Sequence, residues 1–215
     1  MTSKSSGDVL YRVLLKTKAL RTGVFKLSSG TLSPYFINMR ITLSHPSAFS
    51  SLVGVYCHIV QSSDILESQE YICGIPTSGL PFASAVAYTL GKALVYVKAK
   101  GETHRGERMI EGVVKAGSSA ILLDDVVGTG LTLASASEAV RRQGGIVTDA
   151  VALLDREEGG RAHLRSNGVE LHVAAGITDI AQRLLEDGVI DDDMFKNVTA
   201  QTTSRKIDRN PRSDR

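Results

Sequence analysis

Helical and strand-like hydrophobic patterns are mixed over the first part of the chain. Apolar residues recur at helical spacing over 8–20, where Asp8 is placed to cap the helix, and again over 46–61. Two short runs between them, 24–28 and 34–41, surround a Ser/Gly turn and are typical of strands. We expect residues 1–60 to form a small hood beside the rest of the molecule.

Short continuous apolar runs alternate with helical segments over most of the remaining chain. The predicted strands are 71–75, 94–97, 120–123, 146–154 and 169–174, and the predicted helices are 83–90, 131–143, 161–166 and 178–186. This alternation is typical of βαβ units, in which helices cover both faces of a parallel sheet. The sequence therefore predicts an α/β fold with a parallel sheet flanked by helices.

Two polar segments follow neither pattern. Residues 98–111 are charged, contain glycines and show no apolar period, so we predict a loop there. Residues 199–215 are polar and basic, which predicts a flexible tail. Residues 1–198 are then expected to form a single domain.

The composition is that of an ordinary globular protein. Hydrophobic residues make up 42% of the 215 positions and charged residues 22%. Two cysteines are too few for a disulfide framework, which favours a cytoplasmic protein. The net charge of +2 comes from the basic end of the chain, so nucleic acid is not an expected partner. The sequence shows neither a secretory signal nor a run of about 18 apolar residues, so no membrane association is expected.

The segment 120–132, Ala-Ile-Leu-Leu-Asp-Asp-Val-Val-Gly-Thr-Gly-Leu-Thr, carries the clearest chemical signal. A predicted strand ends at Asp124 and Asp125, and a loop with two glycines leads into a helix. Ligands bind beyond the carboxyl ends of the strands in an open parallel sheet. Glycines allow the backbone to approach a phosphate closely, and the free N–H groups at a helix start attract anions. The hydroxyls of Thr129 and Thr132 add further donors.

Other phosphate-binding loops fit this segment less well. A Walker loop requires a lysine after the last glycine, and none follows Gly130. A dinucleotide fingerprint requires a third glycine where Leu133 stands. Two carboxylates would repel a bare phosphate but can accept hydrogen bonds from sugar hydroxyls, so a ribose phosphate is the better ligand. The alternative is a glycine-rich turn that follows two solvated acids.

Residues 124–130 resemble the phosphoribosyl pyrophosphate (PRPP) signature of the type I phosphoribosyltransferases. Residues 25–36 resemble the N-terminal hood of the orotate phosphoribosyltransferases, and residues 74–81 resemble their pyrophosphate loop. Residues 108–112 and 153–159 resemble two flanking segments of that family. The C-terminal half is also similar to the transferase domain of uridine monophosphate synthases. The resemblance implies transfer of a phosphoribosyl group from PRPP to orotate, which yields orotidine 5′-monophosphate and pyrophosphate in UMP biosynthesis.

The resemblance also implies roles for individual residues. Asp124 and Asp125 would be catalytic residues that hold the ribose hydroxyls. Residues 126–132 would hold the 5′-phosphate, and residues 77–79 the pyrophosphate. The implied donor-binding residues are Lys98, Thr77, Ser78, Gly79, Val126, Val127, Gly128, Thr129, Gly130, Leu131 and Thr132. Arg156 would pair with the orotate carboxylate, which a planar guanidinium suits. Tyr35 and Phe36 would flank the orotate ring.

The loop 98–111 would close over the donor and be lent across the interface of a homodimer. Within it His104 stands where the family has a loop histidine that could bind the pyrophosphate. Lys100 and Arg105 lie close to position 102, where the family has its catalytic lysine, and we expect Lys100 to act as a catalytic residue in its place. Mg²⁺ is the implied cofactor and would arrive with PRPP, so no protein side chain is assigned to it.

Four positions depart from the usual family pattern. Ala99 and Glu102 stand where lysines are usual, Ser28 replaces a frequent lysine, and Gly128 replaces a threonine that contacts orotate. The first two leave open a PRPP-binding regulator with little catalysis. Gly128 leaves open a phosphoribosyltransferase for another base.

Overall fold

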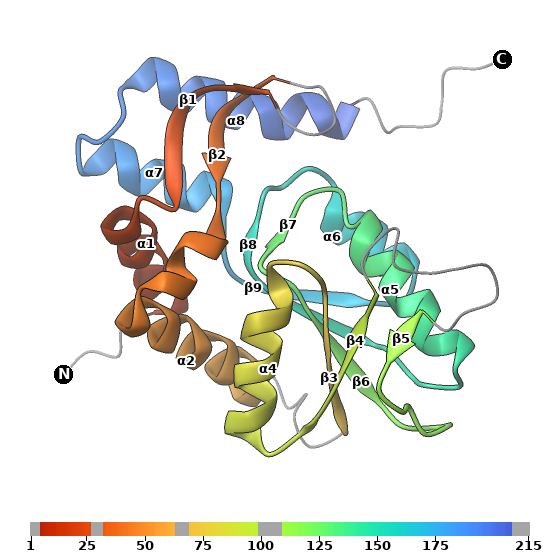
Figure 1. Ribbon diagram of the computed structural model, residues 1–215. Coiled ribbons are helices and arrows are strands. Elements are labelled where there is room, and N and C mark those ends of the chain that lie inside the picture. The colour runs from red at the N-terminus through yellow and green to blue at the C-terminus, as the bar shows by residue number, and fades with distance from the viewer. Residues whose placement is uncertain (1–4, 27–31, 63–68, 99–108, 208–215) are drawn as a thin grey trace, which may run out of the picture.

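A seven-stranded sheet and a separate two-stranded hairpin form the framework (Figure 1). The structure, a computed structural model, describes residues 5–26, 32–62, 69–98 and 109–207. The sheet contains β3 (Tyr71–Gly74), β4 (Ala93–Val97), β5 (Ile110–Glu111), β6 (Ala120–Leu123), β7 (Val126–Val127), β8 (Asp149–Asp155) and β9 (Glu170–Gly176). The strand order is β5-β4-β3-β6-β8-β7, with β9 also paired to β8. All pairings are parallel except β4 with β5, so the predicted fold class is confirmed.

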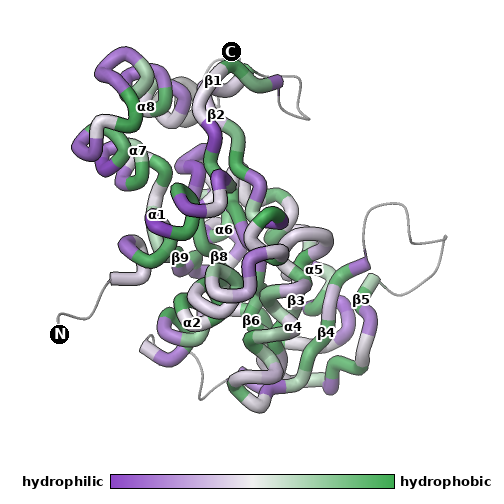
Figure 2. The backbone as a smooth tube through the Cα atoms, turned by 60° about the vertical axis from the view of Figure 1, so that its left-hand side comes forward, coloured by the Kyte–Doolittle hydropathy of each residue, from purple (hydrophilic) through white to green (hydrophobic). Residues whose placement is uncertain are grey.

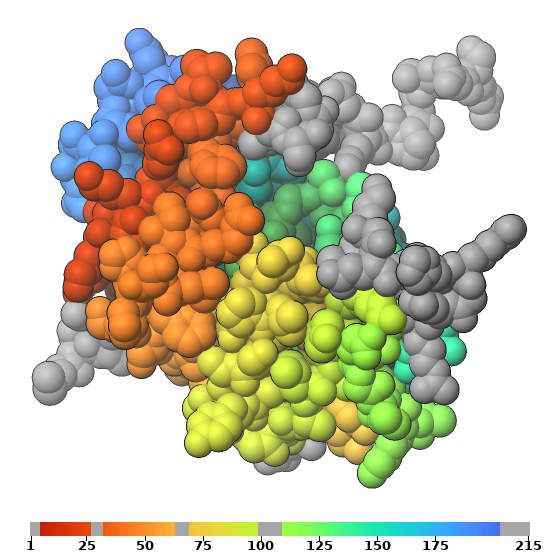
Figure 3. Space-filling view, viewed as in Figure 1, coloured from red at the N-terminus to blue at the C-terminus, as the bar shows by residue number. Residues whose placement is uncertain are grey.

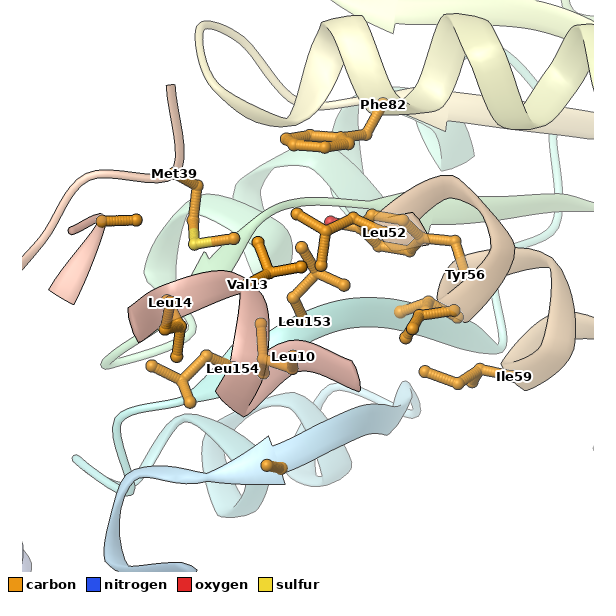
Figure 4. Close-up of a cluster of buried hydrophobic side chains, with 14 of the residues drawn as sticks. Leu10, Val13, Leu14, Met39, Leu52, Tyr56, Ile59, Phe82, Leu153 and Leu154 are labelled. Atoms are coloured by element: carbon orange, nitrogen blue, oxygen red, sulfur yellow. The ribbon is translucent and has the colours of Figure 1, made fainter. Parts of the chain in front are cut away.

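Helices cover both faces of this sheet. Helices α1 (Ser6–Thr17), α2 (Pro46–Ser62) and α4 (Gly79–Leu90) lie on one side, and α5 (Leu131–Arg142) and α6 (Gly160–Ser166) lie on the other (Figure 1). Successive strand residues point to opposite faces, so Ile72 packs into the first helical layer and Cys73 into the second. Both faces of β3 and β6 are buried, which explains their continuous apolar runs. Figure 4 shows the first layer, where Leu52, Tyr56 and Phe82 pack together.

The hood stands at one end of the sheet. It includes the antiparallel hairpin of β1 (Leu20–Lys26) and β2 (Leu32–Ile37), followed by a 3₁₀ helix, η1 (Met39–Ser44). Helices α7 (Ile177–Glu186) and α8 (Asp192–Ile207) lie beside the hairpin although they come from the other end of the chain (Figure 1). The hydroxyl of Ser33 in β2 donates to Oε1 of Gln201 in α8 at 3.0 Å.

The C-terminal prediction is wrong between residues 199 and 207. We expected a flexible tail from residue 199, but α8 continues to Ile207. Figure 2 shows that α8 is mostly hydrophilic, in contrast to β6. A few side chains nonetheless fix it: Val198 is 3% exposed and Thr202 7%. Packing against the hood therefore outweighs the polar composition, and residues 208–215 lie outside the described residues.

Several element boundaries also differ from the predicted ones. Ser5, not Asp8, is the N-cap of α1, and the two side chains form a reciprocal capping box. Residues 39–41 begin the 3₁₀ helix instead of extending β2, and α4 begins four residues before its predicted start. Ile110 and Glu111 form strand β5 instead of belonging to a loop, because they pair with the edge of β4.

In the part of the chain that the structure describes, no helix is long and apolar enough to cross a membrane.

Candidate active site

The sequence motifs meet at the carboxyl ends of β3, β6 and β8. Parallel pairing aligns Gly74 with Leu123, and Leu123 with Val151, so the segments after these strands emerge at the same edge. Figure 3 shows a hollow between the hood and the start of α4, with later green and teal segments at its floor. The structure therefore brings together segments that are far apart in the chain.

The segment after β3, residues 75–79, packs directly on the aspartate pair, and we call it the β3 loop. Ile75 N–H donates to the carbonyl of Leu123 at 3.0 Å. A Cβ on Gly79 would lie 2.8 Å from both the Leu123 carbonyl oxygen and the Asp124 Cα. Only glycine fits at this approach of two backbones. A Cβ on Gly79 would also lie 2.9 Å from Oδ1 of Asp124, so this end of the β3 loop lies beside that carboxylate.

Asp124 and Asp125 are held by their own backbone and by the core beneath. The Asp125 N–H donates to Asp124 Oδ1 at 2.9 Å, and the Tyr56 hydroxyl donates to the Asp124 carbonyl at 2.7 Å. Burial, and then the neighbouring charge of Asp125, raise the pKa of Asp124 well above its usual value. Burial also raises the pKa of Asp125. Both charged forms are therefore poorly stabilised, and hydroxyl donors or a cation would favour them.

Residues 126–132, which we call the glycine loop, are shaped by close backbone contacts. Gly130 has φ +75°, and its Cβ would lie 2.9 Å from the Gly160 carbonyl oxygen. A Cβ on Gly160 would in turn lie 2.5 Å from the Gly128 carbonyl oxygen. The loop leads into α5 at Leu131, so its end presents free N–H groups, as an anion site requires.

Arg156 lies between the glycine loop and the hood. Its N–H donates to the Val127 carbonyl at 2.7 Å, and its guanidinium carbon lies 4.9 Å from the centre of the Tyr35 ring. One terminal nitrogen, Nη2, lies 3.0 Å from Oε1 of Glu158. The Nε of Arg156 is buried and donates to no acceptor among the described residues. The arrangement offers a partly unused guanidinium next to an aromatic ring.

The remaining expected site residues are placed less centrally. Phe36 follows Tyr35 on the strand, and its ring packs 5.7 Å from that of Phe25. Lys98 directly follows β4, and its Nζ lies 3.0 Å from Oε1 of Glu111. Lys100 and His104 lie outside the described residues, as do Ser28, Ala99 and Glu102. The roles of all these residues stay predictions.

Comparison with known proteins decides the family. A phosphoribosyl transferase domain matches residues 59–184. The orotate phosphoribosyltransferase of Cenarchaeum symbiosum (strain A) is 38% identical over 184 residues, which are 86% of this chain and 92% of that protein. The chain belongs to the orotate phosphoribosyltransferase family. The resemblance inferred from the motifs is thereby confirmed, and the chain is an enzyme of this type.

Solved structures agree with this family assignment. The orotate phosphoribosyltransferase from Aeropyrum pernix has a TM-score of 0.71 and 33% identity, covering 81% of this chain and 98% of that one. The UMP synthase of Leishmania donovani has a TM-score of 0.79 and 27% identity, covering 94% of this chain and 43% of that one. The family fold thus extends over the hood as well as the sheet.

Three residues near the site were not singled out from the sequence. Tyr56 supports Asp124 from helix α2, and Arg40 in η1 lies close enough to Asp125 to help lower its pKa. Glu158 pairs with Arg156. Tyr56 and Arg40 carry no sequence signal, because their partners are far away in the chain. Glu158 could have been found, since it lies in the same Asp-Arg-Glu-Glu run as Arg156.

Proposed function

We propose that the chain transfers the phosphoribosyl group of PRPP to orotate, giving orotidine 5′-monophosphate and pyrophosphate in UMP biosynthesis. The observation that carries this proposal is the single edge shared by Asp124, Asp125, the glycine loop and Arg156. It combines hydroxyl acceptors, an anion cradle and a guanidinium for a carboxylate. PRPP and a carboxylated base together require those three features.

The donor would bind along the glycine loop and the β3 loop. The Asp124 and Asp125 carboxylates accept hydrogen bonds from the ribose hydroxyls, which offsets the unfavourable burial of their charge. Backbone N–H groups of residues 126–132 bind the 5′-phosphate. Thr77, Ser78 and Gly79 bring backbone donors to the pyrophosphate.

Orotate would bind between Arg156 and the hood. The Arg156 guanidinium pairs with the carboxylate, and Tyr35 limits where that guanidinium lies through the ring contact beneath it. Phe36 covers the ring from the hood. The base nitrogen is thereby directed at the anomeric carbon of the ribose.

Catalysis would rest on charge stabilisation. Positive charge develops on the ribose as the pyrophosphate leaves, and the Asp pair lies on the ribose side. Lys100 and His104, together with Lys98, stabilise the negative charge that the leaving pyrophosphate gains.

Mg²⁺ is proposed as the cofactor. The buried Asp124 and Asp125 carboxylates fit a site that receives cationic charge with its ligand. No group of three or more His, Cys, Asp or Glu suited to a metal occurs among the described residues. The ion would therefore be held mainly by PRPP oxygens, where it neutralises the leaving pyrophosphate.

We also propose a cytoplasmic homodimer that exchanges residues 98–111 between subunits. Val113, two residues after that segment, is 72% exposed, and Leu94, four residues before it, is 38% exposed. Both cysteines are buried and free, which suits a reducing compartment. Mixing the Lys100→Ala and Asp125→Asn proteins, each of reduced activity, tests the exchange: activity above that of either variant alone supports it, because one mixed site has both residues intact. No recovery from stable mixed dimers contradicts it.

A steady-state assay tests the function directly. We expect pyrophosphate release from PRPP and Mg²⁺ with orotate, and none with uracil or adenine.

Asp125→Asn should lower kcat/KM for PRPP on the order of 10- to 100-fold, as the loss of a hydrogen bond to a charged group predicts. Asp193→Asn, on the exposed part of α8, should change nothing. PRPP binding without turnover would instead indicate a regulator, and turnover with another base would indicate a different transferase.

A further inference from the structure

The Arg156 guanidinium already has a carboxylate partner within the chain. Glu158 is 4% exposed, and its Oε1 lies 3.0 Å from Nη2 of Arg156. The Arg156 side chain is itself only 15% exposed. A substrate carboxylate that approaches Arg156 therefore meets a buried ion pair and not an isolated cation.

Glycine at position 128 makes room for this partner. A Cβ on Gly128 would lie 3.0 Å from Oε2 of Glu158 and 4.0 Å from Cδ of Arg156. The two carboxylate oxygens of Glu158 thus contact different residues: Oε1 lies beside Arg156, and Oε2 lies over Gly128 in the glycine loop. Gly128 and Glu158 therefore fit each other sterically.

The pairing reduces what Arg156 can offer to a ligand. A guanidinium attracts a carboxylate most strongly when no other anion lies beside it. The negative charge of Glu158, 3.0 Å from Nη2, cancels much of that attraction. Both Nε and Nη2 of Arg156 are buried, and neither donates a hydrogen bond to an acceptor among the described residues. Orotate and orotidine 5′-monophosphate both carry the carboxylate, so tight binding by Arg156 would stabilise substrate and product alike. Such uniform binding does not raise kcat.

We propose that Glu158 is a positioning residue that competes with the carboxylate of the base for Arg156. It holds the guanidinium above Tyr35 and sets how strongly the site prefers a carboxylated pyrimidine over one without a carboxylate. This inference rests on the proposed function, in which Arg156 binds the orotate carboxylate.

Two nucleotides separate this role from a general structural one. Orotidine 5′-monophosphate and uridine 5′-monophosphate share the ribose phosphate, and only the first carries the carboxylate. Binding of each to the full chain is measured by calorimetry for the wild type and for Glu158→Gln. Glutamine keeps the shape of the side chain and removes its charge. We expect orotidine 5′-monophosphate to bind on the order of tenfold more tightly to Glu158→Gln, and uridine 5′-monophosphate to bind equally well to both proteins.

A matched control and a second variant accompany this experiment. Glu138→Gln removes a carboxylate that lies 3.5 Å from Arg142 on the exposed surface of α5, and should change neither affinity. Glu158→Met also removes the charge and should shift the preference in the same direction, which keeps the test available if Glu158→Gln does not fold. In steady state, KM for orotate should fall in both Glu158 variants while KM for PRPP stays constant.

Three results would overturn the inference. An unchanged or weaker affinity of Glu158→Gln for orotidine 5′-monophosphate would show that Glu158 does not compete. An equal change for both nucleotides would indicate a structural effect on the glycine loop. Equal affinity of Glu158→Gln for the two nucleotides would show that Arg156 does not bind the carboxylate even without a competing charge, and in that case the proposed role of Arg156 fails together with this inference. The first two results leave the proposed function intact.

Discussion

Asp124 and Asp125 are placed where burial raises the pKa of each carboxyl group. Such a group binds its proton more tightly in the folded chain than in the unfolded one. The free energy of unfolding should therefore fall as the pH rises above about 3.8, the ordinary value, and through the raised pKa. Binding of PRPP would offset this loss of stability, since its hydroxyl donors favour the charged carboxylates.

Asp124→Asn should separate stability from function. Asparagine keeps an oxygen that can accept from the Asp125 N–H and removes the buried charge. We expect the free energy of unfolding at pH 7 to rise by on the order of 1 kcal/mol, while PRPP affinity falls. Urea denaturation at several pH values measures the first effect. The free energy of unfolding of the variant should fall less steeply with rising pH than that of the wild type. A variant less stable than the wild type at pH 7 would contradict the electrostatic account.

Arg156→Ala should act on one substrate. Because the guanidinium lies by Tyr35 in the hood, KM for orotate should rise about tenfold or more, and KM for PRPP much less. Arg142→Ala, on the exposed face of α5, is the matched control. Equal increases in both KM values would mean that Arg156 supports the loops and does not contact the carboxylate.

At the level of elements, the β3 loop and the chain at Leu123 and Asp124, just before the glycine loop, depend on their packing against each other. Gly79 lies where the two backbones are closest, so any side chain must separate them. Pairing of β7 with β8 and the Arg156 N–H bond to Val127 fix the other side of the glycine loop. A change at one contact should therefore affect the whole donor site.

Gly79→Ala tests this coupling. Because the added Cβ would lie 2.8 Å from backbone atoms, we expect a loss of about 1–3 kcal/mol in the free energy of unfolding and weaker PRPP binding. The comparison is Gly54→Ala on the exposed face of α2, where a Cβ meets nothing within 4 Å. That change should stabilise the protein by roughly 0.5–1 kcal/mol and leave PRPP binding unaltered. Similar behaviour of the two variants would contradict the steric argument.

At the scale of the molecule, the hood connects the two ends of the chain. Tyr11 in α1 donates from its hydroxyl to Asp187 Oδ2 at 2.6 Å, and Arg183 in α7 pairs with Asp8. Ser33 in β2 bonds to Gln201 in α8. The hairpin that carries Tyr35 to the site is therefore supported by the C-terminal helices.

Truncation tests this support. Removing residues 199–215 eliminates Gln201 and the buried Thr202, and should raise KM for orotate and speed hydrogen exchange in β2. Removing only residues 208–215 leaves α8 whole and should change neither quantity. If both truncated proteins behaved like the wild type, α8 would have no part in positioning the hood.

The sequence by itself determined the sheet and the location of the chemistry. Continuous apolar runs such as 120–123 can be buried on both faces only in a sheet with helices on either side, and the structure has that arrangement. Parallel strands then place the segments after them at one edge, so Asp124, Asp125 and Arg156 could be expected together from sequence order. These features are local patterns or direct consequences of strand direction.

Only the tertiary structure decided the features that depend on distant partners. Residues 199–207 are polar and look like a tail, yet they continue α8, which packs on β2. Tyr35 lies under Arg156, and Glu158 fills the space over Gly128, because the hood and two strand ends meet there. The free energy of such contacts depends on the shape and charge of groups far away in the chain. No local pattern around residues 35, 128 or 199 contains that information, which is why it appeared only when the chain was folded.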